Sequence, residues 1–472
     1  MKSFLGEDFL LDSETARRLY FDFATGEPIY DYHSHLPPRE IAGDRRFANL
    51  TEIWLEDDHY KWRAMRAAGV LEHFITGNAD AVDKFRAFAG IVPQCLGNPI
   101  YHWTHMELRK PFGIETLLDA STADDVWRTA GQRLAEDAFS ARGLLDQFNV
   151  RMIGTTDDPA DSLDDHAALA ADPAFDIAVL PTWRPDALFK PERADFLRWI
   201  RRLGDARGSD IRSYTDLLDA LTSRLEYFAD RGCVSADHGF DRMQFSTEGP
   251  PPEEIFEQRL KGRRPEAREL VAWRSALALW LGRRYAAHGW VMQLHIGALR
   301  DTNSRMGGRL GPNTGFDSIA DEPYARPLAA FLDALEKESS LPKTILYGLN
   351  PGDNEMLATM AGNFQADGIA GKVQFGSAWW FNDQRDGIVR QLTSVARMGL
   401  LACSVGMLTD SRSLLSFSRH EYYRRILCNL IGGWVEAGEA PSDFELLGNM
   451  VRDICSRNTV AFFGLGGLHA DG

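Results

Sequence analysis

The sequence predicts an α/β protein built as a (β/α)8 barrel. Eight short apolar, β-rich runs follow one another along the 472 residues, separated by segments with helical patterning. Strands that alternate with helices form parallel sheets, and eight such units can close into a barrel. Polar residues fall at the ends of these runs, where barrel active sites lie. An open doubly wound sheet ranks second, because no Gly-x-Gly-x-x-Gly turn follows an early run.

The first expected strand, residues 29–36, follows a lead-in helix within residues 7–28 that Ser13 could cap, and it cannot continue past two prolines. His33 and His35 stand at its end. In an extended chain, residues two apart project to the same side, so both imidazoles can reach one metal ion. Imidazole binds zinc, iron, nickel and, less well, manganese, so the two histidines do not identify the metal. For an isolated His-x-His, two surface histidines in a loop would be the simpler interpretation.

A long segment without strand-like runs follows the first strand. Residues 39–149 are rich in Trp and Arg and read as mainly helical. More than a hundred residues is too long for an ordinary connection, which predicts a helical insertion or a lid. We therefore expect residues 1–38 and 150–472 to form the barrel, and residues 39–149 to form an insertion subdomain that contributes to the active site.

The other seven expected strands are residues 150–156, 178–184, 233–239, 291–295, 343–347, 373–376 and 401–408. Helices are expected at 214–231, at 265–288 with Gly289 as the terminator, and near 421–430 and 443–456 to complete the outer ring.

Composition narrows the class of protein. Hydrophobic residues make up 44% and charged residues 25%, as in an ordinary soluble globular protein. The formal charge of -16 argues against a nucleic-acid partner. No apolar run is long enough to cross a membrane, and the first residues lack the features of a signal peptide, so we expect a cytoplasmic protein. The five cysteines are widely spaced and read as reduced thiols. Assembly into a homo-oligomer is left open.

An aspartate at the end of the eighth expected strand favours a metal site. In a closed barrel the first and eighth strands are neighbours, so Asp410 would meet His33 and His35. Two or three imidazoles plus one carboxylate form a catalytic rather than a structural ligand set. His295, at the end of the fifth strand, could be a ligand, a substrate partner or a core residue. Arg412 could clamp a substrate carboxylate bidentately, or could instead form a salt bridge with Asp410.

Several blocks together resemble the uronate isomerase (glucuronate isomerase) family of the amidohydrolase superfamily. They occur in the family's order from near the N-terminus to the last helices: residues 30–36 (YDYHSHL), 56–63 (EDDHYKWR), 292–303 (MQLHIGALRDTN), 315–319 (GFDSI), 379–382 (WWFN) and 409–412 (TDSR). The resemblance implies interconversion of D-glucuronate with D-fructuronate, and of D-galacturonate with D-tagaturonate, in uronate catabolism.

The resemblance also implies roles for matching residues. His33, His35 and Asp410 would hold one divalent metal, most often zinc, with His295 a further ligand or a near neighbour. The substrate would be bound by Arg412, Arg184 and Asp237, with His238 as the alternative to Asp237. Apart from the resemblance, His295 is a candidate substrate partner, and Trp379 could stack on a sugar, with core packing as the alternative. His59 and Tyr60 would enter the site from the insertion, with helix packing beside Trp62 as the alternative. A binuclear centre is not expected, because the fourth strand lacks a lysine and the sixth ends without a histidine.

The expected chemistry is an aldose-ketose isomerisation through a cis-enediol, in which a base removes the proton from C2. Asp410 or Tyr60 would move this proton, and a tyrosine with an ordinary pKa of about 10 would need help from its surroundings. Two other functions stay open at this point. A metal-dependent amidohydrolase or lactonase acting on a sugar acid could use the same groups, and a non-catalytic sugar-acid binding protein would bind uronate without turnover.

Overall fold

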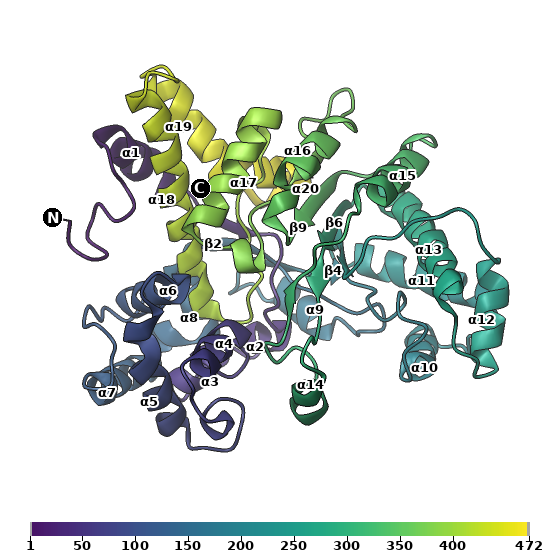
Figure 1. The fold of residues 1–472 in the computed structure, drawn as a ribbon, viewed down its shortest axis with the longest axis horizontal. Coiled ribbons are helices and arrows are strands. Elements are labelled where there is room, and N and C mark those ends of the chain that lie inside the picture. Colours follow the sequence, from purple (N-terminus) through teal and green to yellow (C-terminus); the bar gives the residue numbers. More distant parts are fainter. Residues whose placement is uncertain (1, 470–472) are drawn as a thin grey trace.

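A computed structural model describes residues 2–469, and its centre is a run of parallel strands (Figure 1). One ladder has the order β1-β2-β3 and the other the order β10-β9-β6-β5-β4. The strands are β1 (Ile29–Asp31), β2 (Val150–Gly154), β3 (Ala178–Leu180), β4 (Thr182–Trp183), β5 (Ser235–Phe240), β6 (Val291–Ile296), β9 (Thr344–Gly348) and β10 (Val373–Phe375). Only Pro181 separates β3 from β4, and Asp157 beyond β2 bridges to Trp183 in β4. The two ladders therefore form one parallel array.

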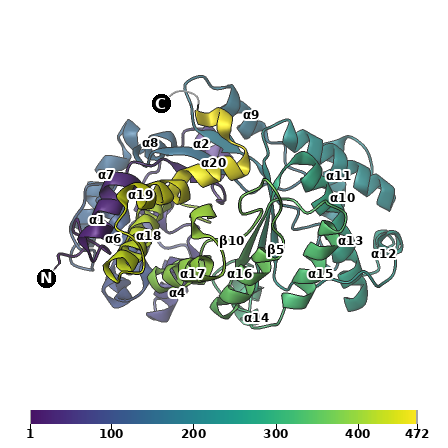
Figure 2. The same ribbon diagram turned by 90° about the horizontal axis from the view of Figure 1, so that it is seen from above.

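Seven of the eight expected strands are present in this array, in the order that a (β/α)8 barrel requires. Their carboxyl ends lie together, because all pairings within the two ladders are parallel; Gly239, for example, pairs with His295. The predicted α/β class is thus confirmed, and Figure 2 shows the helices surrounding the strands. A small antiparallel pair, β7 (Ala298–Leu299) and β8 (Ser318–Ile319), follows the end of β6.

The prediction of an eighth strand at residues 401–408 is wrong. Leu401–Cys403 form a 3-10 helix, and residues 404–410 carry no strand pairing in the described part of the chain. Gly406 has φ 71°, outside the strand region, and a side chain there would collide with the carbonyl of Ile454. The amide of Val405 donates to the side chain of Gln374 at 3.1 Å, which takes the place of a backbone partner on β10. The segment still lies beside β1, as the site below requires.

The segment after β1 is helical. Residues 39–149 contain no strand within the described chain. The helices here are α2 (Pro38–Ala42), α3 (Leu50–Trp54), α4 (His59–Ala67), α5 (Ala81–Ile91), α6 (Pro99–Arg109), α7 (Ala123–Leu134) and α8 (Ala141–Gln147). They gather at one end of the molecule (Figure 1) and share a hydrophobic core with Ile29, Val150 and Leu414. Whether this segment folds as a separate subdomain stays a prediction.

The remaining helices surround the strands. The lead-in helix is shorter than expected: α1 (Glu14–Leu19) begins after Ser13, whose Oγ accepts from the Ala16 amide at 3.0 Å. The long helix α13 (Ala267–His288) ends at Gly289 as predicted, with φ 70°. The others are α9 (Asp164–Ala171), α10 (Phe196–Arg207), α11 (Tyr214–Ala229), α12 (Pro252–Leu260), α14 (Ser304–Leu310), α15 (Ala325–Glu336), α16 (Asn354–Gly362), α17 (Arg385–Met398), α18 (Ser418–Glu436), α19 (Phe444–Arg452) and α20 (Asn458–Phe463).

The C-terminal helix closes the amino end of the strands. Phe462 and Phe463 of α20 belong to a hydrophobic cluster with Tyr32, Val291 and Ile345. Lys343, directly before β9, donates through Nζ to the carbonyl of Phe462. The amino end of the barrel is therefore packed with apolar side chains, which leaves the carboxyl end for polar residues. No described helix is both long and apolar enough to pass through a bilayer.

Candidate active site

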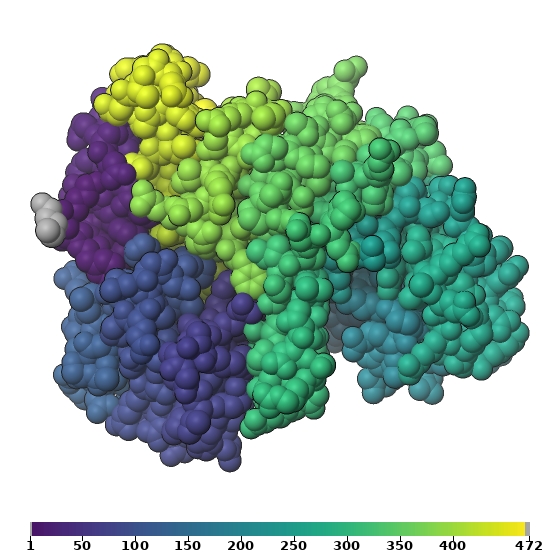
Figure 3. Space-filling model, in the orientation of Figure 1, coloured from purple at the N-terminus to yellow at the C-terminus, as the bar shows by residue number. Residues whose placement is uncertain are grey.

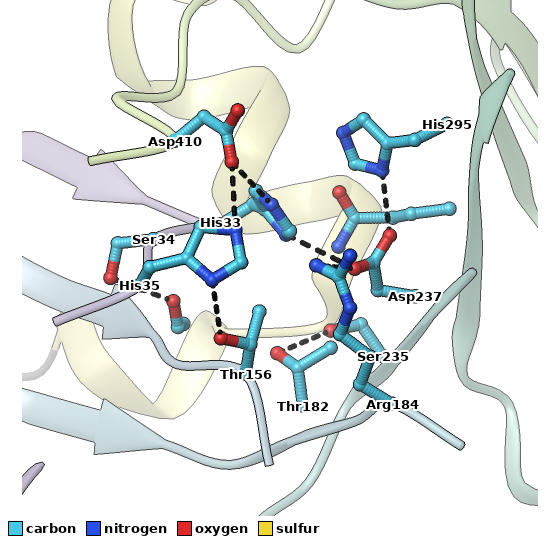
Figure 4. Close-up of polar contacts among 12 residues, drawn as sticks. His33, Ser34, His35, Thr156, Thr182, Arg184, Ser235, Asp237, His295 and Asp410 are labelled. Atoms are coloured by element: carbon cyan, nitrogen blue, oxygen red, sulfur yellow. Dashed lines mark hydrogen bonds and ion pairs between the residues drawn. The ribbon is translucent and has the colours of Figure 1, made fainter. Parts of the chain in front are cut away.

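Three of the predicted ligands meet at the carboxyl end of β1 (Figure 4). The Nε2 atoms of His33 and His35 each lie 3.1 Å from Oδ1 of Asp410. The three residues offer donor atoms within 4.8 Å of one another. Residues separated by 377 positions in the chain thus converge on one point, as the sequence predicted.

Backbone contacts bring the last segment to β1. The Asp410 amide donates to the His33 carbonyl at 3.2 Å, and the His35 amide donates to the Ser411 carbonyl at 2.9 Å. Asp410 itself has φ 45°, in the left-handed region. A non-glycine residue there costs on the order of 1–3 kcal/mol and persists only where its surroundings hold it. The indole N–H of Trp379 adds a further contact, donating to Oδ2 of Asp410 at 2.8 Å.

A second group, built on Asp237, adjoins the first. The Nδ1 atom of His295 lies 2.6 Å from Oδ1 of Asp237, and Nη1 of Arg184 lies 2.7 Å from Oδ2. Asp237, His295 and His33 also form a set of possible ligands, with His33 Nδ1 3.9 Å from Asp237 Oδ2. The Asp237 carboxylate is already neutralised by Arg184, so this set is less suited to a cation than the first. His295 stacks on Tyr347 with ring centres 4.2 Å apart.

The surroundings set the charge of these groups. Burial alone would raise the pKa of Asp410, but the hydrogen bonds from His33 and His35 hold that pKa well below its usual range. Burial likewise opposes ionisation of Asp237, yet Arg184, His295 and His33 keep its pKa low. Burial lowers the pKa of His35 to about 4. Near neutral pH both carboxylates are therefore ionised and His35 is neutral, as metal ligands need to be. Burial opposes protonation of His33, but the carboxylates of Asp237 and Asp410 raise its pKa, so a cation bound there would displace a proton from this imidazole.

The site opens into a cavity of about 530 Å³. The molecular surface is indented between the segment around α14 and the segments around α10 and α12 (Figure 3). Eight of the ten predicted site residues line the cavity: His33, His35, His59, Arg184, His295, Trp379, Asp410 and Arg412. Asp237 does not line the cavity but contacts two residues that do, Arg184 and His295. The predicted residues therefore face one shared space.

Positive charge in this cavity is mostly neutralised. Its arginines at 184, 193, 274 and 300 each have a carboxylate within 4.0 Å. Arg412 and Lys190 are the two lining cations with no carboxylate that close among the described residues. The alternative role for Arg412, a salt bridge to Asp410, is thus not seen. An exposed, unpaired guanidinium beside Asp410 is suited to bind an anionic ligand, despite the protein's net charge of -16.

The insertion supplies His59 and Tyr60 at the start of α4. His59 lines the main cavity, whereas Tyr60 lines an adjoining cavity of about 200 Å³ that shares Asp410 and Arg412. Oδ1 of Asp58 caps the helix by accepting from the amides of Tyr60 at 2.9 Å and Lys61 at 3.0 Å. Burial lowers the pKa of His59 to about 4 and raises that of Tyr60 well above 10. Tyr60 is therefore protonated at neutral pH.

Some contributing residues were not found from the sequence. Thr156 Oγ1 lies 2.9 Å from Nδ1 of His35 and orients the ring from the end of β2. Oδ2 of Asp186 lies 3.1 Å from Nε of Arg184. Thr156 is the last residue of one expected strand and Asp186 follows the end of the next by two residues, and these positions were the one available signal. His238, the alternative to Asp237, lies 3.0 Å from the Tyr285 hydroxyl and does not line the cavity.

The donor set of His33, His35 and Asp410 fits a divalent cation. Two imidazoles and one carboxylate are a typical ligand set for catalytic zinc and related ions. They lie at the edge of a cavity that has room for a further ligand. His295 is grouped with Asp237 and His33 and not with His35 and Asp410. The geometry thus supports a metal site, while the identity of the metal is not determined by these residues.

Comparison with known proteins assigns the family. The glucuronate isomerase family model matches residues 1–463. The uronate isomerase from Marinomonas sp. (strain MWYL1) is 56% identical to this protein, over 98% of this chain and 100% of its own. The uronate isomerase from Photorhabdus laumondii is 55% identical, over 99% of each chain. The solved structure of uronate isomerase from Thermotoga maritima matches with a TM-score of 0.92 at 32% identity, covering 98% of this chain and 100% of its own. The structure of glucuronate isomerase from Caulobacter crescentus matches with a TM-score of 0.90 at 27% identity, covering 98% of this chain and 97% of its own. The chain therefore belongs to the glucuronate isomerase family.

Proposed function

We propose that this protein interconverts D-glucuronate with D-fructuronate, and D-galacturonate with D-tagaturonate, in cytoplasmic uronate catabolism. The observation that carries the proposal is the family match over residues 1–463, since it spans every element that contributes to the cavity. The site supports it with an ionised carboxylate, buried imidazoles and an unpaired arginine around one space. An isomerase of this kind needs to hold an anionic sugar and to move one proton between neighbouring carbons.

One divalent cation, with zinc as the first choice, is part of the proposal. His33, His35 and Asp410 would hold it, as their converging donor atoms allow. When bound, the ion would polarise a sugar oxygen and help to orient the substrate. We place His295 on the substrate side, because its Nδ1 is engaged by Asp237 and its buried Nε2 has no hydrogen-bond partner among the described residues.

The arginines and the tryptophan would bind the sugar. Arg412 is proposed to hold the substrate carboxylate, because it is exposed to the cavity and has no acidic partner there. Arg184 contacts Asp237 through Nη1 and Asp186 through Nε, and it lines the cavity, where it would contact the sugar. Trp379 is buried at 5% exposure and donates to Asp410, so its role would be to aim the carboxylate and to line the sugar site.

Proton transfer is assigned to Asp410. A base must be unprotonated, and the low pKa of Asp410 keeps it so, whereas the raised pKa of Tyr60 keeps the phenol protonated. Asp410 would therefore remove the proton from C2 and return it to C1 through a cis-enediol. His59 and Tyr60 would donate hydrogen bonds to the oxygens while the hydrogen moves between O2 and O1.

An isomerase assay tests this proposal. Wild-type protein is incubated with D-glucuronate in D2O, and the product is followed by NMR. We expect D-fructuronate to form, and deuterium uptake at carbon would further support an enediol route. Release of an acid from a lactone or amide without isomerisation would identify a hydrolase, and uronate binding without turnover would identify a binding protein. Asp410→Asn should abolish most of the turnover while the protein stays folded.

A further inference from the structure

We propose that Asp31 and Thr409 are positioning residues that fix the Asp410 carboxylate in the site. Both side chains are buried, at 0% and 3% exposure. Oδ1 of Asp31 accepts from the Thr409 amide at 2.9 Å, and Oδ2 accepts a second, short hydrogen bond from the Thr409 hydroxyl. One carboxylate of β1 thus holds both donors of the residue that precedes Asp410.

The contact between Asp31 and Thr409 takes the place of a missing strand pairing. Residues 404–410 have no ladder partner on β1 in the described chain, although a closed barrel would place a strand there. Besides the backbone contacts of Asp410 and Ser411, two side chains provide the link: Asp31 of β1 contacts Thr409, and the hydroxyl of Tyr32, the residue after β1, donates to the carbonyl of Gly406 at 3.1 Å. Side-chain bonds fix individual positions without imposing strand geometry on the segment. This leaves Asp410 free to adopt a conformation that a regular strand would forbid.

That conformation is what brings the carboxylate to the histidines. Asp410 has φ 45°, which an L-residue keeps only when contacts on both sides hold it. Before it stands Thr409, fixed by Asp31; after it stands Ser411, whose carbonyl accepts from the His35 amide at 2.9 Å. With both neighbours fixed, Oδ1 reaches 3.1 Å from His33 and from His35. Losing the Thr409 contact should let this turn relax and move the carboxylate.

The experiment replaces the hydroxyl of Thr409. Thr409→Val keeps the shape of the side chain and removes its donor, whereas Thr409→Ser keeps the donor. Thr344→Val is the matched control, because the buried Thr344 hydroxyl donates to the Pro342 carbonyl at 2.9 Å at the amino end of β9, away from the site. Each protein is assayed for kcat and KM with D-glucuronate, and its metal-free form is titrated with Zn²⁺ by calorimetry.

We expect Thr409→Val to lower kcat about tenfold or more and to weaken Zn²⁺ binding about tenfold or more, with KM within about threefold of wild type. Thr409→Ser and Thr344→Val should keep kcat and Zn²⁺ affinity within about threefold. Wild-type kcat or Zn²⁺ affinity in Thr409→Val would overturn the proposal, and so would an equal loss in Thr344→Val. The inference rests on the proposed function, whose own failure would appear separately as a wild-type protein that does not isomerise uronate.

Discussion

Asp237 accepts a 2.6 Å hydrogen bond from Nδ1 of His295, and this contact fixes which nitrogen of the imidazole is available to a ligand. The low pKa of Asp237 keeps it ionised, so it acts as the acceptor. The proton therefore resides on Nδ1, and Nε2 is left as an acceptor in the site. His295 of β6 and Asp237 of β5 thus work as a pair, although the sequence separates them by 58 positions.

Asp237→Asn should disturb this pair without changing its size. An amide can present its NH2 group to Nδ1, which favours the other tautomer and turns Nε2 from an acceptor into a donor. It also removes the charge opposite Arg184, 2.7 Å away. We expect kcat to fall by about 10- to 100-fold, the usual cost of losing the partner that orients a site histidine. Steady-state kinetics with D-glucuronate would check this, and activity within about twofold of wild type would contradict it.

Arg412→Met should weaken substrate binding. Loss of a charge-assisted pair costs about 1.5–3 kcal/mol, which corresponds to a rise in KM of roughly 10- to 100-fold. Arg193→Met is the matched control: Arg193 lines the same cavity, but its Nε lies 3.3 Å from Asp195. That variant should change KM by about twofold at most. Equal effects from both variants would show that general charge, and not Arg412 itself, holds the substrate.

Asp58→Ala should lower both stability and activity. Oδ2 of Asp58 lies 2.6 Å from the buried Nζ of Lys61, whose other carboxylate partner, Glu107, is 3.7 Å away. Removing Asp58 takes away the nearer partner of this buried ammonium, at a cost of about 3 kcal/mol. It also removes the cap that sets His59 and Tyr60 at the start of α4. Ser13→Ala, which removes the cap of α1, should cost only about 1 kcal/mol and leave kcat unchanged. Denaturant unfolding and kinetics on both variants test the difference.

His166→Gln should change how stability depends on pH. Burial lowers the pKa of His166 to about 4, from an ordinary 6.5. The unfolded chain therefore binds the proton more readily, so this histidine lowers the free energy of unfolding as pH falls from about 6.5 toward 4. The loss at pH 5 relative to pH 8 is about 2 kcal/mol. Wild type should lose that much more stability than His166→Gln between these pH values in urea denaturation; parallel losses would contradict the assignment.

Local patterns predicted much of the fold. Ser13 and Gly289 mark helix ends by their side-chain chemistry and backbone freedom, and the structure confirms both. His33 and His35 converge because strand geometry places alternate residues on one side, which needs no tertiary information. The contact with Asp410 is expected from a neighbouring eighth strand; the segment does lie beside β1, although hydrogen bonds other than a strand ladder hold it there.

Other features depend on contacts between distant segments. The apolar residues 401–408 look like a strand, but the close approach of Gly406 to Ile454 and the side-chain bond from Gln374 override that pattern. Nothing near Asp31 in the sequence indicates that its carboxylate binds Thr409, 378 positions away. The role of Thr156 is likewise visible only once β1 and β2 are paired.

The most direct test of the central claim is anomalous diffraction from crystals of the protein grown with Zn²⁺. We predict a single strong peak at the carboxyl end of β1, about 2.0–2.2 Å from nitrogens of His33 and His35 and from a carboxylate oxygen of Asp410. A zinc ion bound by the two histidines with the Asp410 carboxylate well outside bonding distance would contradict the account, as would the absence of zinc from this position.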